Sequence, residues 1–477
     1  MKKVWISTTL FFLVIFGAWY LVIHLGQEFI ERHRQAEKTL TPIAPGKNHP
    51  QYWSMNGEDI MLLGGSVEDN LFQIDGVEEH LDLLQSAGGN YVRNTMSSRD
   101  DGNLWPFAQN EDGLYDLNRW NEAYWSRFDH FLKACSIRDI VVQIELWATF
   151  DFYGEPWAVN PFNPKNNVNY TSDRVHLRSE INSHPVMTEN DFFRSVPSQH
   201  CNLKLLEYQQ LFMDKLLSYS LAYGNVLYCI DNETSVTAEW ATFWARYIKA
   251  VAIEHNKEIY VTEMWDPWNL DHIIHRETTD HPELYDFVDI SQNNHNTGDV
   301  HWNNGLSMIK RLTSRGMLRP VNNVKVYGND GGKHQTTQNS IDAYVRNVLL
   351  GAASSRFHRP PTGQGLNLTA QRIISSMRMV SGKDGFYDAV PHNQLLEMRE
   401  ADEAYCRAVA GKMYLVYFPQ GGEVSLQVLR APAGLQVEWL DIKKAAWDVA
   451  NNVKVENKKV VLKTPTSDSW LAYIKIN

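Results

Sequence analysis

The stretch VLYCIDNE, residues 226–233, joins an apolar run to an acidic end. Residues 226–230 are apolar or aromatic, which is typical of a short strand buried on both faces. Asp231, Asn232 and Glu233 then follow without a spacer. Parallel strands carry functional groups where they end, so Asn232 and Glu233 are the first candidates for a site.

Seven further runs of this kind alternate with segments of helical period, as in residues 77–87, where Val77, Leu81 and Leu84 recur. Such alternation implies parallel strands, and eight units predict an α/β chain with a (β/α)8 TIM barrel. The alternative, an open doubly wound sheet, often shows G-x-G-x-x-G after its first strand, and that motif is absent here. The expected strands are residues 61–65, 91–95, 140–147, 226–230, 259–262, 287–291, 324–327 and 352–357, and the expected helices are 77–87, 120–134, 203–221, 238–253 and 341–350.

The N-terminus predicts a transmembrane helix. Lys2 and Lys3 precede an uncharged run to Gln27, and its core at 5–25 reaches the length of about 20 apolar residues that a bilayer requires. The alternative is a cleaved signal peptide, whose apolar region is about 7–15 residues and precedes a small-residue site. The two lysines favour a cytoplasmic N-terminus, with the rest of the chain outside the membrane, or secreted after cleavage.

A change of pattern near residue 402 marks a second domain. Short alternating runs with turn residues replace the helical period and predict a small antiparallel β-sandwich. The expected organisation is an anchor or signal at 1–27, a polar stem at 28–47, the barrel at 48–395 and the β-sandwich at 396–477.

Composition excludes several classes of function. The 477 residues carry a formal net charge of −11, which argues against nucleic-acid binding. The four cysteines are widely spaced without C-x-x-C, so we expect no disulfide scaffold, structural zinc, other metal or cofactor. Nothing in the sequence indicates an oligomeric state. Aromatic residues make up 12% of the chain, with 16 Trp, which suits both sugar stacking and core packing.

Polar residues follow the expected strands, and the carboxyl ends of barrel strands build the active site. Carboxylates beside His, Asn and Trp fit glycoside hydrolysis, which needs one carboxyl as acid and a second as nucleophile or base. These candidates at strand ends are Arg93, Glu145, Trp147, Asn232, Glu233, Glu263, Trp265, His295, Asp330 and His358.

In the order of these residues along the sequence, the chain resembles the superfamily of (β/α)8 retaining glycoside hydrolases that includes cellulases, mannanases and β-galactosidases. That superfamily has Asn-Glu at the end of its fourth strand, which implies that Glu233 is the acid/base and Asn232 binds the sugar 2-hydroxyl. The resemblance also implies that Arg93 steadies the nucleophile and that His295 lies near it. The C-terminal part resembles small β-domains found behind such barrels, some of them named for collagen binding.

The seventh strand departs from this pattern. The superfamily has Glu there, whereas this chain has Asn329-Asp330. Asp330 is the candidate second carboxylate, and the neighbouring glycines permit a close backbone approach. A separation of about 5–5.5 Å from Glu233 would mean retention, and about 6.5–9.5 Å inversion. Alternatively, Glu263 or Glu145 supplies the second carboxyl and residues 329–332 only form a turn.

The connection from residue 150 to 200 is far longer than usual and rich in aromatic residues, so we expect it to form a wall of a carbohydrate cleft. The alternative is an exposed insertion used for oligomer contacts. The sequence as a whole predicts a glycoside hydrolase outside the membrane with a carbohydrate substrate. The other hypothesis is a non-catalytic carbohydrate- or matrix-binding protein on a degenerate barrel.

Overall fold

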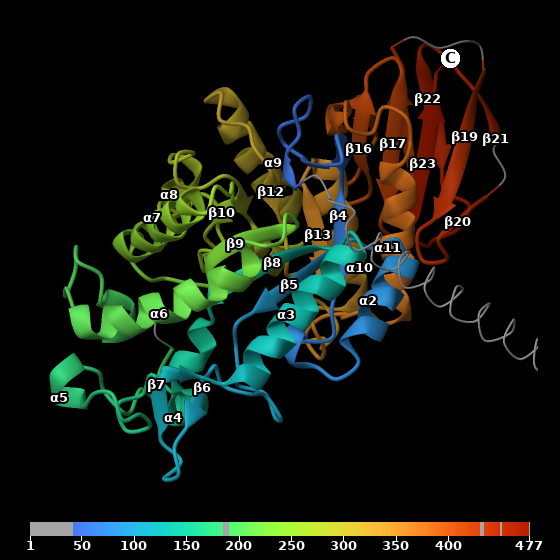
Figure 1. Ribbon diagram of the computed structural model, residues 1–477. Helices are drawn as coiled ribbons and strands as arrows, with labels where there is room; N and C mark the ends of the chain where they lie inside the picture. The colour runs from blue at the N-terminus through green and yellow to red at the C-terminus, as the bar shows by residue number, and fades with distance from the viewer. Residues whose placement is uncertain (1–41, 185–189, 430–433, 449–450, 477) are drawn as a thin grey trace, which may run out of the picture. The chain divides into compact units, whose positions relative to one another are not determined.

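The computed structural model describes residues 42–184, 190–429, 434–448 and 451–476 (Figure 1). The predicted anchor at 1–27 and the stem as far as residue 41 lie outside these ranges. Across the ranges that are described, no helix combines the length and apolar character needed to cross a bilayer. The last stem residues, from 42 to 47, include the short strand β1 (Ala44–Pro45).

Eight parallel strands form the centre of the chain and confirm the α/β class. Six of them pair in the order β10-β9-β8-β5-β4-β13, and β11 pairs with β12. Backbone hydrogen bonds from Asp286 to Val261 and from Ala353 to Val321 join the two groups at both ends, so the strands close into a ring. The strands are β4 (Leu62–Gly65), β5 (Tyr91–Thr95), β8 (Val141–Trp147), β9 (Val226–Asp231), β10 (Val261–Thr262), β11 (Val288–Asp289), β12 (Val321–Asn322) and β13 (Ser354–Phe357).

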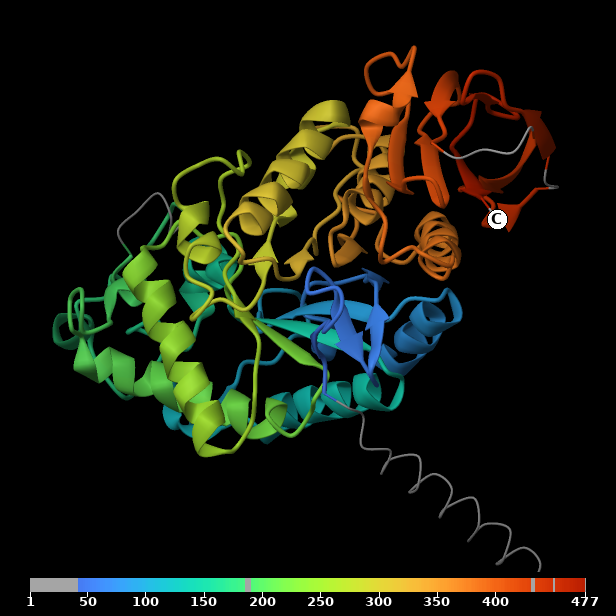
Figure 2. The ribbon, with the colours of Figure 1, turned by 90° about the horizontal axis from the view of Figure 1, so that it is seen from above.

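Helices surround this ring of strands (Figure 2). They form because their apolar residues fall on one side, as in α2, which buries Val77, Leu81 and Leu84. The sequence did not predict α9 and α11, and between β10 and β11 only a short helix, α8, is present. The helices are α2 (Val77–Ser86), α3 (Glu122–Ile137), α6 (Leu203–Ser220), α7 (Ala238–Glu254), α8 (His275–Thr279), α9 (Gly298–Ser314), α10 (Thr337–Leu350) and α11 (Leu368–Ser381).

The long insertion after β8 folds around its own aromatic core. Phe152 and Phe192 lie with ring centroids 4.1 Å apart, and Trp157 is 1% exposed. These rings therefore do not face solvent, and the prediction of an aromatic cleft wall is wrong for most of the segment. The insertion contains η2 (Thr149–Phe152), α4 (Gly154–Val159), α5 (Ser172–Val175) and η3 (Asp191–Arg194).

Two small antiparallel sheets lie outside the ring. One joins β1, β2 (Trp53–Met55) and β3 (Glu58–Ile60), just before the first barrel strand. The other is the hairpin of β6 (Phe107–Gln109) and β7 (Tyr115–Trp120), which follows β5.

The C-terminal region consists of two antiparallel sheets with a shared apolar core. β14 pairs with β16 although it precedes residue 396, so the sheet begins before the predicted domain boundary. The region is fixed to the barrel by hydrogen bonds from Tyr417 to Asp342 and from Arg407 to the hydroxyl of Tyr52. Its strands are β14 (Val390–Pro391), β15 (Leu396–Glu397), β16 (Tyr405–Val409), β17 (Met413–Phe418), β18 (Glu423–Gln427), β19 (Gly434–Asp441), β20 (Ala446–Trp447), β21 (Asn451–Lys454), β22 (Lys459–Lys463) and β23 (Trp470–Lys475).

Candidate active site

A cleft of about 500 Å³ opens at the carboxyl ends of the barrel strands. Every one of the eight strands, or the loop that follows it, contributes to its lining. This is where (β/α)8 enzymes place their chemistry. In strand order, the lining includes Asp69, Arg99, Phe150, Glu233, Asp266, His295, Tyr327 and His358.

Glu233 lies in this cleft at the end of β9, with 13% of its side chain exposed. Its backbone has a φ of +48°, in the left-handed region that side-chain-bearing residues rarely adopt. Backbone strain of this kind concentrates at functional sites. One carboxylate oxygen, Oε1, accepts a hydrogen bond from the hydroxyl of Tyr327 at 2.6 Å and lies 2.7 Å from the ammonium of Lys325.

These contacts decide the charge of Glu233. Burial alone would raise the pKa of its carboxyl, but the ammonium of Lys325 and the hydroxyl of Tyr327 outweigh burial and hold the pKa well below its usual range. Burial has the opposite effect on an ammonium, and it lowers the pKa of Lys325, whose side chain is 2% exposed. Lys325 follows β12 and lies in the run 324–327 that was expected as the seventh strand, where the resemblance implied a carboxylate. Glu233 therefore faces a cation from that strand.

Asn232 is held beside Glu233 by two cations. Its Oδ1 accepts hydrogen bonds from Arg93 Nη2 at 2.8 Å and from the ammonium of Lys325. The side-chain nitrogen of Asn232, Nδ2, donates to no group in the described part of the chain, so it is available for a ligand.

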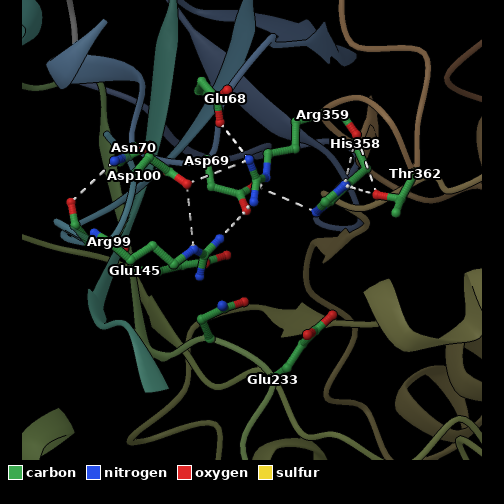
Figure 3. A network of polar contacts seen from close by, with 12 residues as sticks. Glu68, Asp69, Asn70, Arg99, Asp100, Glu145, Glu233, His358, Arg359 and Thr362 are labelled. Carbon is green, nitrogen blue, oxygen red and sulfur yellow. Dashed lines mark hydrogen bonds and ion pairs between the residues drawn. The ribbon is translucent and has the colours of Figure 1, made fainter. Parts of the chain in front are cut away.

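Asp69 lines the cleft and is bound by the buried guanidinium of Arg93. Arg93 is fully buried and donates to Asp69, to Asn232 and, at 2.5 Å, to Glu145. Arg99 and Arg359 also bind Asp69, at 2.9 and 3.0 Å (Figure 3). Burial would raise the pKa of Asp69, but these guanidinium groups hold it well below its usual range. Asp69 is thus a fixed anion that positions the cations.

The opposite wall carries a stacked aromatic pair. Trp268 is 51% exposed, and its ring lies 4.0 Å from that of His295, nearly parallel to it. Burial lowers the pKa of His295 to about 4, so the imidazole is neutral at physiological pH. The Nδ1 atom of His295 has no hydrogen-bond partner among the described residues.

A third carboxyl group of the cleft, besides Asp69 and Glu233, is Asp266, which follows β10. Its side chain is half-buried, and burial together with the nearby charge of Glu233 raises its pKa. The cleft thus holds two carboxyls that stay ionised, Asp69 and Glu233, and a third, Asp266, that protonates more readily.

Asp330 does not line the cleft. It is exposed, and its carboxylate accepts a hydrogen bond from the Gly332 amide at 2.9 Å and contacts His334 at 2.7 Å. These contacts lower its pKa. Residues 329–332 therefore form the turn that was the alternative interpretation, and the geometry does not support Asp330 as the second carboxylate.

Two predicted sugar-stacking residues lie in the core. Trp147 and Trp265 are each 1% exposed. Trp147 packs against Trp244 and Phe212, with ring centroids 5.1 and 5.4 Å apart. Neither indole can reach a ligand in the cleft, because other side chains cover both.

Glu263 and Glu145, the alternative second carboxyls, lie beneath the cleft and are fully buried. Burial raises the pKa of Glu263 to about 8, and its Oε1 accepts hydrogen bonds from the backbone amides of Asp231 and Met264. His358 does line the cleft and lies 3.5 Å from Asp69.

Sequence reasoning did not single out Asp69, Asp266, Trp268, Lys325 or Tyr327. One signal was present at Lys325, because a charged residue inside the apolar run 324–327 must find a buried partner. No group of three or more His, Cys, Asp or Glu side chains in the described ranges is arranged to hold a metal ion.

Solved structures resemble the fold of this chain. A glycoside hydrolase of family 5 from Bacteroides vulgatus aligns with 91% of this chain and 93% of its own, with a TM-score of 0.58 and 12% identity. The chain therefore shares the (β/α)8 fold of this structure. A second structure, described as a glycoside hydrolase, aligns with a TM-score of 0.60 and 12% identity over 91% of this chain and 97% of its own. No family model and no curated protein matches the sequence.

Proposed function

We propose that this protein is a glycoside hydrolase in which Glu233 is the ionised carboxylate and Asp266 the proton donor. The observation that carries this proposal is that both acids line one cleft, after the paired strands β9 and β10, with pKa values driven in opposite directions. Two carboxyl groups in different protonation states are what glycoside hydrolysis requires.

In the proposed mechanism, Asp266 donates its proton to the glycosidic oxygen as the bond to the anomeric carbon breaks. Glu233 either attacks that carbon or takes a proton from the attacking water. Lys325 keeps Glu233 ionised for this role. The assignment reverses the acid/base role that the resemblance implied for Glu233, because a carboxyl beside an ammonium is a poor proton donor.

The test compares Glu233→Gln and Asp266→Asn on aryl glycosides with good and poor leaving groups. Loss of Glu233 should reduce turnover about 10²–10⁴-fold on all of them. Loss of Asp266 should reduce turnover mainly on poor leaving groups, which need protonation. Asp271→Asn is the matched control, because Asp271 is 68% exposed and pairs with Arg311 outside the cleft. Equal losses by Asp266→Asn on both substrate types would reject its role as the acid.

The second candidate is carbohydrate binding without hydrolysis. It is favoured by one observation: the residue that reaches Glu233 from the seventh strand is Lys325 and not an acid. If the wild type binds oligosaccharides in a fluorescence titration but releases no sugar from any substrate, this candidate holds and the hydrolase proposal fails.

We also propose that the cleft acts outside the cytoplasmic membrane, with residues 1–27 as the anchor. The support is the order of Lys2, Lys3 and the uncharged run that follows. Digestion of intact spheroplasts should cleave the protein, and full protection would contradict this location.

A further inference from the structure

A second groove, of about 430 Å³, runs along the β6–β7 hairpin and is separate from the catalytic cleft. Trp105, Tyr115 and Trp120 line it, and all three are partly exposed. The polar side chains of Asn103 and Glu122 lie among them. This groove is therefore not a gap in the core, because both apolar rings and polar groups reach solvent.

The aromatic rings of the groove are fixed by packing, and some of their polar atoms have no hydrogen-bond partner. Trp120 stacks on Phe107 with a centroid distance of 5.2 Å and an angle of 23°. Among the described residues, neither the hydroxyl of Tyr115 nor the indole nitrogen of Trp105 has a hydrogen-bond partner. Trp105 and Tyr115 make no ring contact among the described residues and can receive an apolar face, whereas the Trp120 ring also has the Lys215 ammonium 5.8 Å from its centroid. The free polar atoms of Trp105 and Tyr115 can bind hydroxyls.

The backbone around the groove is firmly attached to the long insertion and to α3. Tyr115 N donates to Asn166 O at 2.8 Å, and Leu117 N donates to Asn169 Oδ1 at 2.7 Å. The Asn121 side chain donates to Trp105 O at 3.0 Å. A surface fixed in this way loses little conformational entropy when it binds a ligand.

The polar groups select the class of ligand. Asn103 Oδ1 accepts hydrogen bonds from Asn70 and from the Asp100 amide, and its nitrogen has no partner in the described part of the chain. Glu122 makes no ion pair in the described part of the chain, and its carboxylate can accept a hydrogen bond from a ligand. Uncharged amide donors, a carboxylate acceptor and flat rings match a neutral sugar, which has hydroxyls at its edge and C–H groups on its faces.

A short stretch of chain joins the lining of the groove to the lining of the catalytic cleft. Arg99 lines the cleft and binds Asp69, and the chain then runs directly to Asn103 and Trp105. Six residues span at most about 20 Å, so the two sites are within reach of one extended ligand. Asn70, which follows the cleft residue Asp69, donates to Asn103 and links both walls.

We infer that the groove along β6–β7 is a second carbohydrate-binding site, which holds a neutral polysaccharide chain at a distance from the catalytic cleft. The inference rests on the proposed function only in taking a carbohydrate as the ligand. It implies that the natural ligand is an oligomer or polymer longer than the cleft alone can hold.

The test is affinity electrophoresis of the full chain in detergent, through native gels that contain soluble glucomannan, xylan or hydroxyethylcellulose. Trp105→Ala and Trp120→Ala should each weaken retention by about fivefold or more on the polysaccharide that retards the wild type. Trp105→Phe should recover part of it. Trp447→Ala is the matched control, because Trp447 is partly exposed in the C-terminal region and far from the groove in sequence.

Each outcome decides the inference. Loss of retention with an unchanged circular dichroism spectrum in both groove variants supports it. Wild-type retention that survives both substitutions, or no retention of the wild type by any of the three polymers, overturns it. The hydrolase proposal is tested separately, because retention in the gel needs no turnover. If the protein is retained through Trp105 but cleaves no substrate, the groove inference is supported and the hydrolase proposal is rejected.

Discussion

Replacement of Lys325 by methionine tests the electrostatics of the cleft directly. The ammonium of Lys325 lies 2.7 Å from Glu233, and the two side chains are only 2% and 13% exposed. At an effective dielectric constant of about 20, charges at this distance attract by about 6 kcal/mol. Removing one partner of a buried pair leaves the other charge uncompensated, so we expect the free energy of unfolding to fall by about 3–5 kcal/mol near neutral pH.

The loss should depend on pH. In the wild type, the lowered pKa of Glu233 means that its ionised form stabilises the fold above the carboxyl pKa of an unfolded chain, about 4.3. That stability is lost only as the pH falls through the folded pKa. Without Lys325, the pKa of Glu233 rises, and protonation relieves the buried charge at a higher pH. The difference between variant and wild type should therefore shrink as the pH falls from about 7 to about 5.

Urea denaturation followed by tryptophan fluorescence measures this difference at both pH values. Lys454→Met is the control, because Lys454 pairs with Glu456 at 2.7 Å and the two side chains are 80% and 68% exposed. We expect that substitution to cost about 1 kcal/mol or less. Adding Glu233→Gln to Lys325→Met should restore part of the stability. The reasoning is refuted if Lys325→Met costs no more than the control, or if its cost does not change with pH.

Three further predictions follow from the placement of other residues. Asp330→Ala should keep near-normal turnover on aryl glycosides, because its carboxylate binds its own turn; a large loss that azide rescues would restore it as a nucleophile. Trp147→Ala should lower the free energy of unfolding by about 3–5 kcal/mol, because it leaves a cavity among packed rings, and a thermal midpoint equal to that of the wild type would contradict this. Deletion of residues 1–41 should leave a folded protein by size exclusion and circular dichroism, whereas deletion of 1–47 should lower its melting temperature, since it removes β1 and the hydrogen bond from Ile43 to Gly224.

Most barrel strands could be predicted because an apolar run bounded by polar residues marks them, as in 226–233. The seventh strand, β12, lies at Val321–Asn322, before the predicted run 324–327. The helical spacing of Ile373, Met377 and Val380 also indicates α11. The residues of the site were harder to predict than the strands, because sequence order does not say which side chain points into the cleft. Asp330 and Lys325 lie five positions apart, and only the folded backbone separates the exposed turn from the buried cation.

The sequence likewise does not show which aromatic side chains are buried and which reach the cleft. Trp147 is the last residue of β8 and Trp268 follows β10, yet the first is 1% exposed and the second 51%. The difference depends on whether the insertion after β8 covers the ring, which is a tertiary contact between distant segments. Composition alone cannot separate the two cases, because aromatic rings serve cores and ligand sites equally well.

The buried anchoring of Asp69 by several cations has a consequence for ionic strength. Dissolved salt weakens interactions between exposed charges beyond about 8–10 Å, but it screens buried pairs much less. Arg93 is fully buried and Asp69 is 5% exposed at their contact, whereas an outer pair such as Lys454 and Glu456 is 80% and 68% exposed. The cleft should thus keep its internal charge pattern from dilute buffer to brine, while the charges on the outer surface of the protein lose most of their mutual attraction.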